Sequence, residues 1–292
     1  MDKLTILILS LLSFKGIGNQ TVLNYLDESK NHRKDFSFTE LRTTKIKKIQ
    51  KLIVNKTITN KSWPKINQNS SKKLSDSLSK KIQIINCLDN EYPQRLKKIS
   101  NRPVLLYLKG NKKLLNANKI ITMVGTRTPS VTSQIWTEKI ITDLSDEYVV
   151  ISGLARGIDT IVHQAVVTNK RSTIAVLAHG LDMPIYPYEN KDLALEILKA
   201  EGLLISTYPN GTKVYPHNLV ARDEWQSALS DGLIVAETGI HSGTTNTINF
   251  SIKHQKKIMI FDDKKLEGNQ HFLSKGMFSV KNTLEIKRAM SQ

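Results

Sequence analysis

The stretch that decides the fold is Tyr148-Val149-Val150-Ile151-Ser152-Gly153-Leu154-Ala155-Arg156-Gly157-Ile158-Asp159. It begins as an apolar strand, turns at glycine, and continues through residues 160–166 with a helical pattern. A helix that starts after such a turn exposes unpaired N–H groups and the positive end of its dipole, and glycine lets an anion approach the backbone. Arg156 adds a planar cation suited to phosphate. The stretch therefore predicts an anion-binding unit of strand, turn and helix.

Two further turns follow the same plan. The apolar residues 119–124 lead into Gly125-Thr126-Arg127-Thr128-Pro129-Ser130, where Ser130 is the expected N-cap of a helix around residues 134–144. A turn of small residues after the apolar run 232–236 contains Ser242, Gly243, Thr244 and Thr245. Because the carboxyl ends of parallel strands meet at one edge of a sheet, we expect these turns to face one anionic ligand. The alternative for the two arginines is that they are ordinary solvated surface charges.

Short apolar runs at residues 173–178, 202–206 and 257–261 continue the series, with helical stretches between them. This alternation predicts an α/β fold, a Rossmann-like parallel sheet with helices on both faces. Neither arginine-bearing turn fits G-x-G-x-x-G or the Walker pattern, which disfavours a standard dinucleotide or ATP site.

The positive charge is concentrated at the front of the chain. The whole sequence has 43 Lys and Arg against 26 Asp and Glu, a net charge of +17. Residues 1–118 contain 24 of the basic and 8 of the acidic residues, so the remainder is nearly neutral. Such asymmetry favours a polyanionic partner. The alternative is the lysine-rich composition of an AT-biased genome.

The front of the chain predicts a small helical domain. Residues 4–12 are apolar but too short to span a bilayer, and they lack the flanks of a signal peptide. Gly16-Ile17-Gly18 between two helical stretches is similar to a helix–hairpin–helix or SAM module, or is only a structural connection. Residues 55–81 are polar and predict weak helix with exposed linker. We therefore expect a basic helical domain and linker over residues 1–81 and an extended Rossmann-like domain over residues 82–292.

Cysteine usage excludes one class of site. Cys87 is the only cysteine, so there is neither an intrachain disulfide nor a cysteine-based metal cluster. A reducing cytoplasm is the expected location.

The ordered motifs resemble the DprA/Smf family of bacterial DNA-processing proteins. The matching segments are Tyr92-Pro93, residues 103–111, Gly125-Thr126-Arg127, residues 152–159 with His163, residues 173–177, Gly180-Leu181-Asp182, residues 186–190 and Ser242-Gly243-Thr244. The resemblance implies an extended Rossmann-like domain that binds single-stranded DNA, forms a homodimer and loads the RecA recombinase on incoming strands in natural transformation. It implies no cofactor, metal or membrane.

Carried onto this sequence, the resemblance and the turns assign one set of candidate residues. The DNA- or phosphate-binding candidates are Gly125, Thr126, Arg127, Ser130, Ser152, Gly153, Arg156, Gly157, Asn190, Ser242, Gly243, Thr244 and Thr245. Asp159 and His163 are expected to brace the turn between residues 152 and 159, since their spacing of four places them on one helix face.

The sequence departs from the family at one run of basic residues. The family carries Phe-Pro-x-Arg-Asn-Arg-Ile-Ile, whereas this chain has Leu219-Val220-Ala221-Arg222-Asp223-Glu224-Trp225-Gln226. Carboxylates at Asp223 and Glu224 repel phosphate where arginine would attract it. The family's Val-Pro-Gly is also replaced by Phe261-Asp262-Asp263. The chain is therefore expected to be a diverged member.

Two functional classes remain open at this point. The favoured one is a non-enzymatic protein that binds single-stranded DNA, because Asp159 and His163 lack a nucleophile or metal ligand at a recognisable spacing. The alternative is a Rossmann protein of the SMF/LOG type that senses or hydrolyses a nucleotide derivative, with Glu237 as a candidate base.

Overall fold

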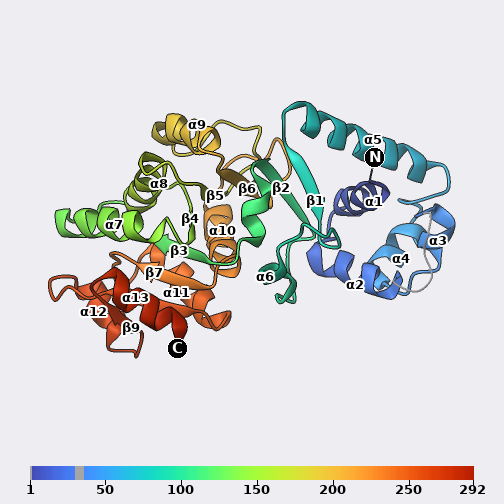
Figure 1. Cartoon of the computed structure of the whole chain (residues 1–292). Helices are drawn as coiled ribbons and strands as arrows, with labels where there is room; N and C mark the ends of the chain where they lie inside the picture. The colour runs from blue at the N-terminus through green and yellow to red at the C-terminus, as the bar shows by residue number, and fades with distance from the viewer. Residues whose placement is uncertain (1, 30–35) are drawn as a thin grey trace. The chain divides into compact units, whose positions relative to one another are not determined.

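The computed structural model describes residues 2–29 and 36–292 (Figure 1). Contacts divide the chain into two compact units, Met1–Tyr92 with Leu96–Tyr107, and Pro93–Arg95 with Leu108–Gln292. The expected boundary at Ile82 falls inside the first unit, because strand β1 (Gln83–Asn86) packs against helices α1 (Lys3–Leu12) and α5 (Ser62–Ser79). Packing thus extends the first unit beyond the boundary expected from composition.

The first unit is mainly helical. Between α1 and α5 it holds α2 (Asn19–Ser29), α3 (Phe38–Arg42) and α4 (Lys47–Val54), and after β1 come α6 (Gln94–Lys97) and the start of β2 (Leu105–Gly110). The apolar residues of α1 form its core, with Leu7, Ile8 and Leu11 fully buried. In the described part of the chain, no helix combines the length and apolar character needed to cross a membrane.

Helix α5 corrects the expectation of an exposed linker before Ile82. Its inner face carries Trp63, Ser70, Leu74 and Ser77, all buried. The hydroxyl of Ser10 on α1 donates to Asn67 Oδ1 at 2.8 Å, and its oxygen lies within hydrogen-bond distance of Ser70 Oγ at 2.9 Å. Small hydroxyl side chains let the two helices approach closely and satisfy each other's polar groups. The sequence predicted only weak helix with linker here because two of the four buried side chains, Ser70 and Ser77, are polar.

The second unit contains seven strands of a parallel sheet in the order β6-β5-β4-β3-β7-β8-β9. Their bounds are β3 Ile120–Val124, β4 Val149–Ser152, β5 Thr173–Leu177, β6 Leu203–Ser206, β7 Gly232–Val235, β8 Lys257–Phe261 and β9 Phe278–Val280. The first six were predicted from their apolar runs and are confirmed. Strand β9 was missed because it is only three residues long and two of them are exposed.

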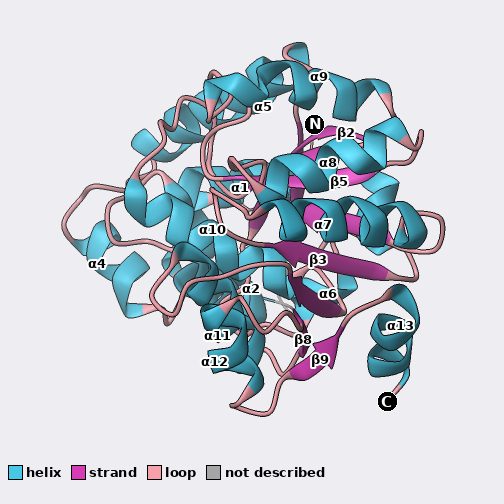
Figure 2. Cartoon of the chain, turned by 90° about the vertical axis from the view of Figure 1, so that its left-hand side faces the viewer, coloured by secondary structure: helices cyan, strands magenta, loops and turns pink. Residues whose placement is uncertain are grey.

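Helices cover both faces of this sheet. They are α7 Val131–Leu144, α8 Ile158–Thr168, α9 Lys191–Lys199, α10 Pro216–Ala228, α11 Gly243–Lys253, α12 Glu267–Leu273 and α13 Thr283–Ser291, with short 3-10 turns at Lys112–Asn116 and Tyr188–Asn190. Figure 2 shows α7 and α8 in front of the strands.

Alternation along the strands explains the two covered faces. Met123 and Ile234 join the core beneath α7 and α8, whereas their neighbours Val124 and Val235 join the core beneath α11 and α12. Successive strand side chains point to opposite faces, so a strand buried on both sides reads as one continuous apolar run. The predicted α/β class with helices on both faces is therefore confirmed.

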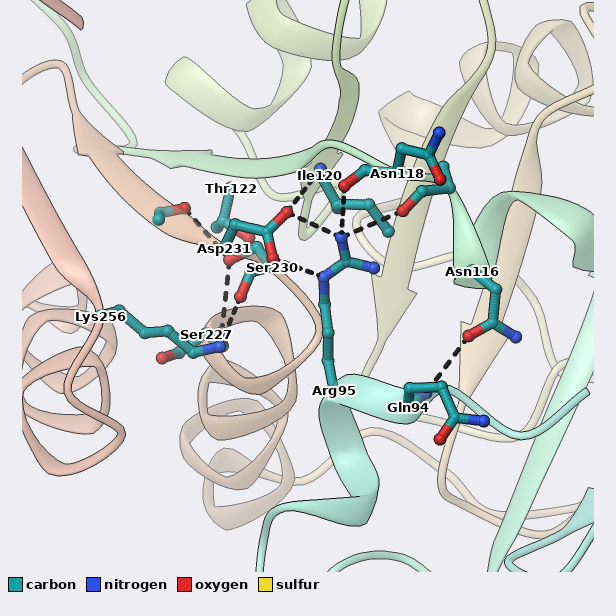
Figure 3. Close-up of polar contacts among 12 residues, drawn as sticks. Gln94, Arg95, Asn116, Asn118, Ile120, Thr122, Ser227, Ser230, Asp231 and Lys256 are labelled. Atoms are coloured by element: carbon teal, nitrogen blue, oxygen red, sulfur yellow. Dashed lines mark hydrogen bonds and ion pairs between the residues drawn. The ribbon is translucent and has the colours of Figure 1, made fainter. Parts of the chain in front are cut away.

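An arginine clamp fixes the amino ends of the two central strands (Figure 3). Arg95 Nε and Nη2 donate to the two carboxylate oxygens of Asp231, each at 2.7 Å. Nη2 also donates to the carbonyls of Ala117 and Asn118, and Asp231 accepts the N–H of Ile120 at 3.0 Å. Asp231 precedes β7 and Ile120 begins β3, so one bidentate pair sets the register of both strands.

Candidate anion-binding site

The three predicted turns meet where the order of the strands reverses. From β3 the chain moves outward through β4, β5 and β6, and then crosses back to β7 on the other side of β3. In open α/β sheets, ligands bind beyond the carboxyl ends of the strands at such a switch point. The turn after β3 and the turn after β7 lie at this point, with the turn after β4 beside them.

Backbone hydrogen bonds join the three turns. Thr126 N–H donates to the carbonyl of Glu237 at 2.8 Å, and Ile158 N–H donates to the carbonyl of Thr126 at 3.2 Å. Gly157 allows this approach, since a Cβ there would lie 2.4 Å from the Thr126 oxygen, and its φ of +75° disfavours other residues. The turns are therefore one backbone assembly.

The two candidate arginines occupy the surface of this assembly. Arg127 is exposed and makes no ion pair with any residue that the structure describes. Arg156 forms an ion pair with Glu189, and their side chains are 63% and 59% exposed. An exposed pair of this kind contributes little stability, so an incoming phosphate can replace the carboxylate as partner of Arg156.

Asp159 and Asn190 hold the turn after β4. Asp159 Oδ2 accepts the N–H groups of Gly153 and Ala155, each at 3.2 Å. Asn190 Nδ2 donates to the carbonyl of Leu154 at 2.9 Å and so supports a buried residue with a φ of +58°. A left-handed leucine is strained and persists only where its surroundings fix it. Both side chains thus position the turn, and the amide N–H group of Asn190 is used in a hydrogen bond within the protein.

Ser152 and His163 are buried beneath the turn after β4. Ser152 Oγ donates to the carbonyl of Met123 at 2.8 Å and links β4 to β3. His163 Nδ1 lies 2.9 Å from Thr173 Oγ1, which itself donates to Val150, so Nδ1 is the donor to Thr173. Burial, with the nearby Arg222, lowers the pKa of His163 to about 3 and keeps the ring neutral. His163 thus contacts Thr173 of β5 and also interacts with the backbone of Ser152, where the turn begins.

Ser130 and Glu237 link the first and third turns. Ser130 caps α7 by accepting the N–H of Ser133 at 3.3 Å, as expected from the sequence. Its own N–H and hydroxyl both donate to Glu237 Oε2 at 2.8 Å. The carboxylate that the sequence offered as a catalytic base is thus bound to the helix cap.

The amino end of α11 carries the third turn. Ser242 and Thr245 form a capping box, and Thr244 is buried beside them. Gly243 is exposed, and a Cβ at that position would contact nothing within 4 Å. The first N–H groups of this helix open toward the ligand edge with the positive end of the helix dipole.

Two adjoining hollows form the site. The larger, which we call the polar cleft, has a volume of about 420 Å³ and includes Thr126, Arg127, Arg222, Asp223, Gly243 and Thr244 in its lining. The smaller, the apolar pocket, has a volume of about 160 Å³ and includes Leu177, Tyr186 and Leu219 in its lining. Arg127, Ala155, Leu219 and Arg222 line both. The described residues include no cluster of His, Cys, Asp or Glu suited to a metal ion.

Sequence reasoning did not foresee the part played by Arg222. This side chain on α10 is 6% exposed, and its Nη1 donates to the carbonyl of Val176 at 3.3 Å. Its Nε lies 3.2 Å from Asp223 Oδ1, and its Nη1 lies 4.0 Å from Asp159 Oδ2. Gly153 makes room for the guanidinium, because a Cβ there would overlap Nη1 at 1.3 Å. Gly153 was the feature of the sequence that could have indicated a buried side chain packed against the turn.

The two acidic departures occupy different places. Asp223 lines the polar cleft, and burial raises its pKa to about 6 despite the neighbouring Arg222. Glu224 lines neither hollow and instead pairs with Lys253 at 2.8 Å and with His254 at 3.5 Å. Only the first carboxylate therefore faces a ligand in the cleft.

The chain is similar in sequence to proteins of one known family. A profile of the family described as DNA recombination-mediator protein A matches residues 83–291. The chain is 36% identical over 194 residues to DNA processing protein DprA of Streptococcus pneumoniae, an alignment covering 65% of this chain and 68% of the relative. It is 33% identical over 182 residues to DprA of Bacillus subtilis, covering 61% and 59%.

Two solved structures share the fold. The crystal structure of DprA from Streptococcus pneumoniae superposes with a TM-score of 0.76 at 29% identity, covering 99% of this chain and 98% of that one. A structure of DNA processing protein A from Helicobacter pylori, described for its single-stranded DNA binding mode, superposes with a TM-score of 0.63 at 28% identity. It covers 70% of this chain and 94% of that one.

Proposed function

We propose that this chain, which belongs to the DNA recombination-mediator protein A family, binds single-stranded DNA in the polar cleft. The observation that carries the proposal is the fused assembly of three turns at the strand switch point, with Arg127 and Arg156 exposed on it. The relative from Helicobacter pylori, described for single-stranded DNA binding, has the same fold. Support thus comes from both local geometry and family.

Phosphate is the group that the cleft is built to contact. Arg127 supplies an exposed guanidinium, and α11 supplies the positive end of its dipole at the exposed Gly243. Thr126 contributes a hydroxyl from the same lining. Contacts of this kind hold the backbone of a strand without reading its sequence.

The candidate catalytic groups support binding rather than chemistry. Asp159 holds two backbone N–H groups, His163 is neutral and turned toward Thr173, and Glu237 is bound to Ser130. None of the three is poised as a general base for a ligand in the cleft. We therefore propose a non-enzymatic role and give the nucleotide-hydrolase alternative second place.

The wider role follows from the family. We propose that the protein acts in the cytoplasm as a homodimer, protects incoming single strands in natural transformation, and loads the RecA recombinase on them. These statements rest on family membership, whereas strand binding rests also on the geometry of the cleft.

The ligand class can be tested by salt dependence. A strand that contacts several phosphates loses affinity steeply with added salt, by about 0.7 logarithmic units per contact and per tenfold salt. A mononucleotide makes one or two such contacts and loses far less. We expect oligothymidylate to bind more tightly than thymidine monophosphate and to show the steeper slope in fluorescence anisotropy and competition titrations. Equal affinity for both ligands would favour the nucleotide-derivative alternative.

A further inference from the structure

Asp223 is a carboxylate in a cleft that is otherwise suited to anions. It stands on α10 with its side chain 14% exposed, and it lines the polar cleft together with Arg127 and Thr244. Asp159 lines the same cleft, and the other lining residues with a charge are Arg127 and Arg222. A phosphate entering the cleft must approach this carboxylate, which repels it.

Asp223 shares its cation with a second carboxylate. Arg222 Nε lies 3.2 Å from Asp223, and Nη1 of the same guanidinium lies 4.0 Å from Asp159. Two ionised carboxylates around one guanidinium leave a net charge of −1. Burial raises the pKa of both carboxylates, Arg222 opposes this, and the charge of Asp159 raises the pKa of Asp223 further.

The charged groups around Asp223 come from three parts of the fold. Arg222 lies on α10 itself, Asp159 on α8, and Arg127 on the turn after β3. From α11 the cleft is lined by Thr244, Asn246 and Thr247, which carry no charge.

Two histidines complete the surroundings of Arg222. Burial is the main cause that lowers the pKa of both His163 and His179, and Arg222 lowers both further. Burial thus favours the neutral ring at both positions. Proton uptake near the cleft floor therefore falls on the two aspartates, and burial raises the pKa of each of them.

We infer that the Asp159–Asp223 pair is an acid-sensitive gate on strand binding, in which uptake of one proton neutralises the cluster and strengthens phosphate binding. The inference rests on the proposed function and deepens it. With both carboxylates ionised, the cleft floor opposes the attraction of Arg127. With one protonated, the guanidinium of Arg222 balances the other, and the repulsion disappears.

The test compares strand affinity at two pH values in the parent and in two variants, Asp223→Asn and Glu224→Gln. Oligothymidylate with a pH-insensitive rhodamine label is titrated at constant ionic strength at about pH 7.5 and about pH 5.5, on either side of the pKa of about 6 for Asp223. The parent is expected to bind about five- to tenfold more tightly at the lower pH. Asp223→Asn is expected to bind at both pH values as tightly as the parent does in acid.

Glu224→Gln is the matched control. It also removes one negative charge, but from a residue that pairs with Lys253 outside the cleft. It should keep the pH profile of the parent. Glu224→Gln also removes a partner of His254, so the deciding comparison is between the parent and Asp223→Asn, which share every titratable group except Asp223. Asp223→Ser provides a second carboxylate-free variant if the asparagine variant folds poorly, as judged by circular dichroism.

The possible outcomes separate the two claims. Strand binding with the same pH dependence in the parent and in the variants that lack the Asp223 carboxylate would overturn the gate and leave the proposed function standing. Absence of binding by every variant at both pH values would overturn the proposed function on which the gate rests.

Discussion

Gly157 sits where two turns touch. Its backbone has a φ of +75° and a ψ of −125°, a conformation that is strained for any side-chain-bearing residue. A Cβ there would also lie 2.4 Å from the Thr126 oxygen and 2.7 Å from the Cα of Arg127. A single glycine thus lets the turn that carries Arg156 rest on the turn that carries Arg127.

Gly157→Ala should therefore damage both the fold and the site. We expect a loss of about 2–3 kcal/mol in the free energy of unfolding, because the strained backbone and the close approach both disfavour the new methyl group. Gly243→Ala is the matched control, since its Cβ would contact nothing within 4 Å at the exposed start of α11. Urea denaturation checks both, and equal stability of the two variants would contradict this account of Gly157.

At the residue scale, the sequence indicated which side chains lie near one another more reliably than it indicated the contacts that each one makes. Arg127 and Arg156 carry exposed charges on glycine turns, as expected from their positions after buried strands. Asn190, in contrast, spends its amide on the carbonyl of Leu154. Such a partner lies far away in the sequence, so only the folded chain reveals it. The burial of Arg222 was hidden for the same reason.

Some helices and strands are easier to predict from the sequence than others. The six longer strands of the second unit are buried on both faces, so each appears as an unbroken apolar run. Helix α5 has the opposite character, since its buried face uses Ser70 and Ser77 beside Leu74. Hydrogen bonds from Ser10 replace part of the apolar contact, and composition alone cannot distinguish this from a linker.

The clamp of Arg95 and Asp231 is an element-scale feature that can be measured. Burial alone would raise the pKa of Asp231, but its bonds from Arg95 and Ile120 more than offset this and lower it. A lowered pKa means that the stabilisation is complete above the pKa of the unfolded chain and is lost as the pH falls through that of the folded protein.

Arg95→Ala should lower the free energy of unfolding by about 1–3 kcal/mol near neutral pH, since a charged bidentate pair is lost. The difference from the parent should shrink in acid, where Asp231 is protonated in both proteins. Arg171→Ala removes an exposed pair with Asp146 and should change stability little. A deficit in Arg95→Ala that stays constant down to strongly acid pH would show that the loss does not come from the ion pair.

At the scale of the whole molecule, charge and shape belong to different parts of the sequence. Residues 1–118 carry nearly all of the net positive charge, whereas the three turns of the proposed site lie beyond residue 119. Diffuse charge speeds the encounter with a polyanion and adds salt-sensitive affinity. Defined contacts require the fixed backbone of the turns. The sequence counts predicted this division of charge, but only the fold shows that all three turns join.

The most direct test of the account is the affinity of Arg127→Ala for oligothymidylate, measured by fluorescence anisotropy at constant salt and neutral pH. Arg127 lines both hollows and forms no ion pair with a described carboxylate, so its loss is expected to remove a contact to phosphate. We expect the dissociation constant to rise about tenfold, as for loss of one charge-assisted hydrogen bond, while Arg171→Ala stays at the parent value. Strand binding by folded Arg127→Ala as tight as that of the parent would contradict the claim that the cleft is the DNA-binding site.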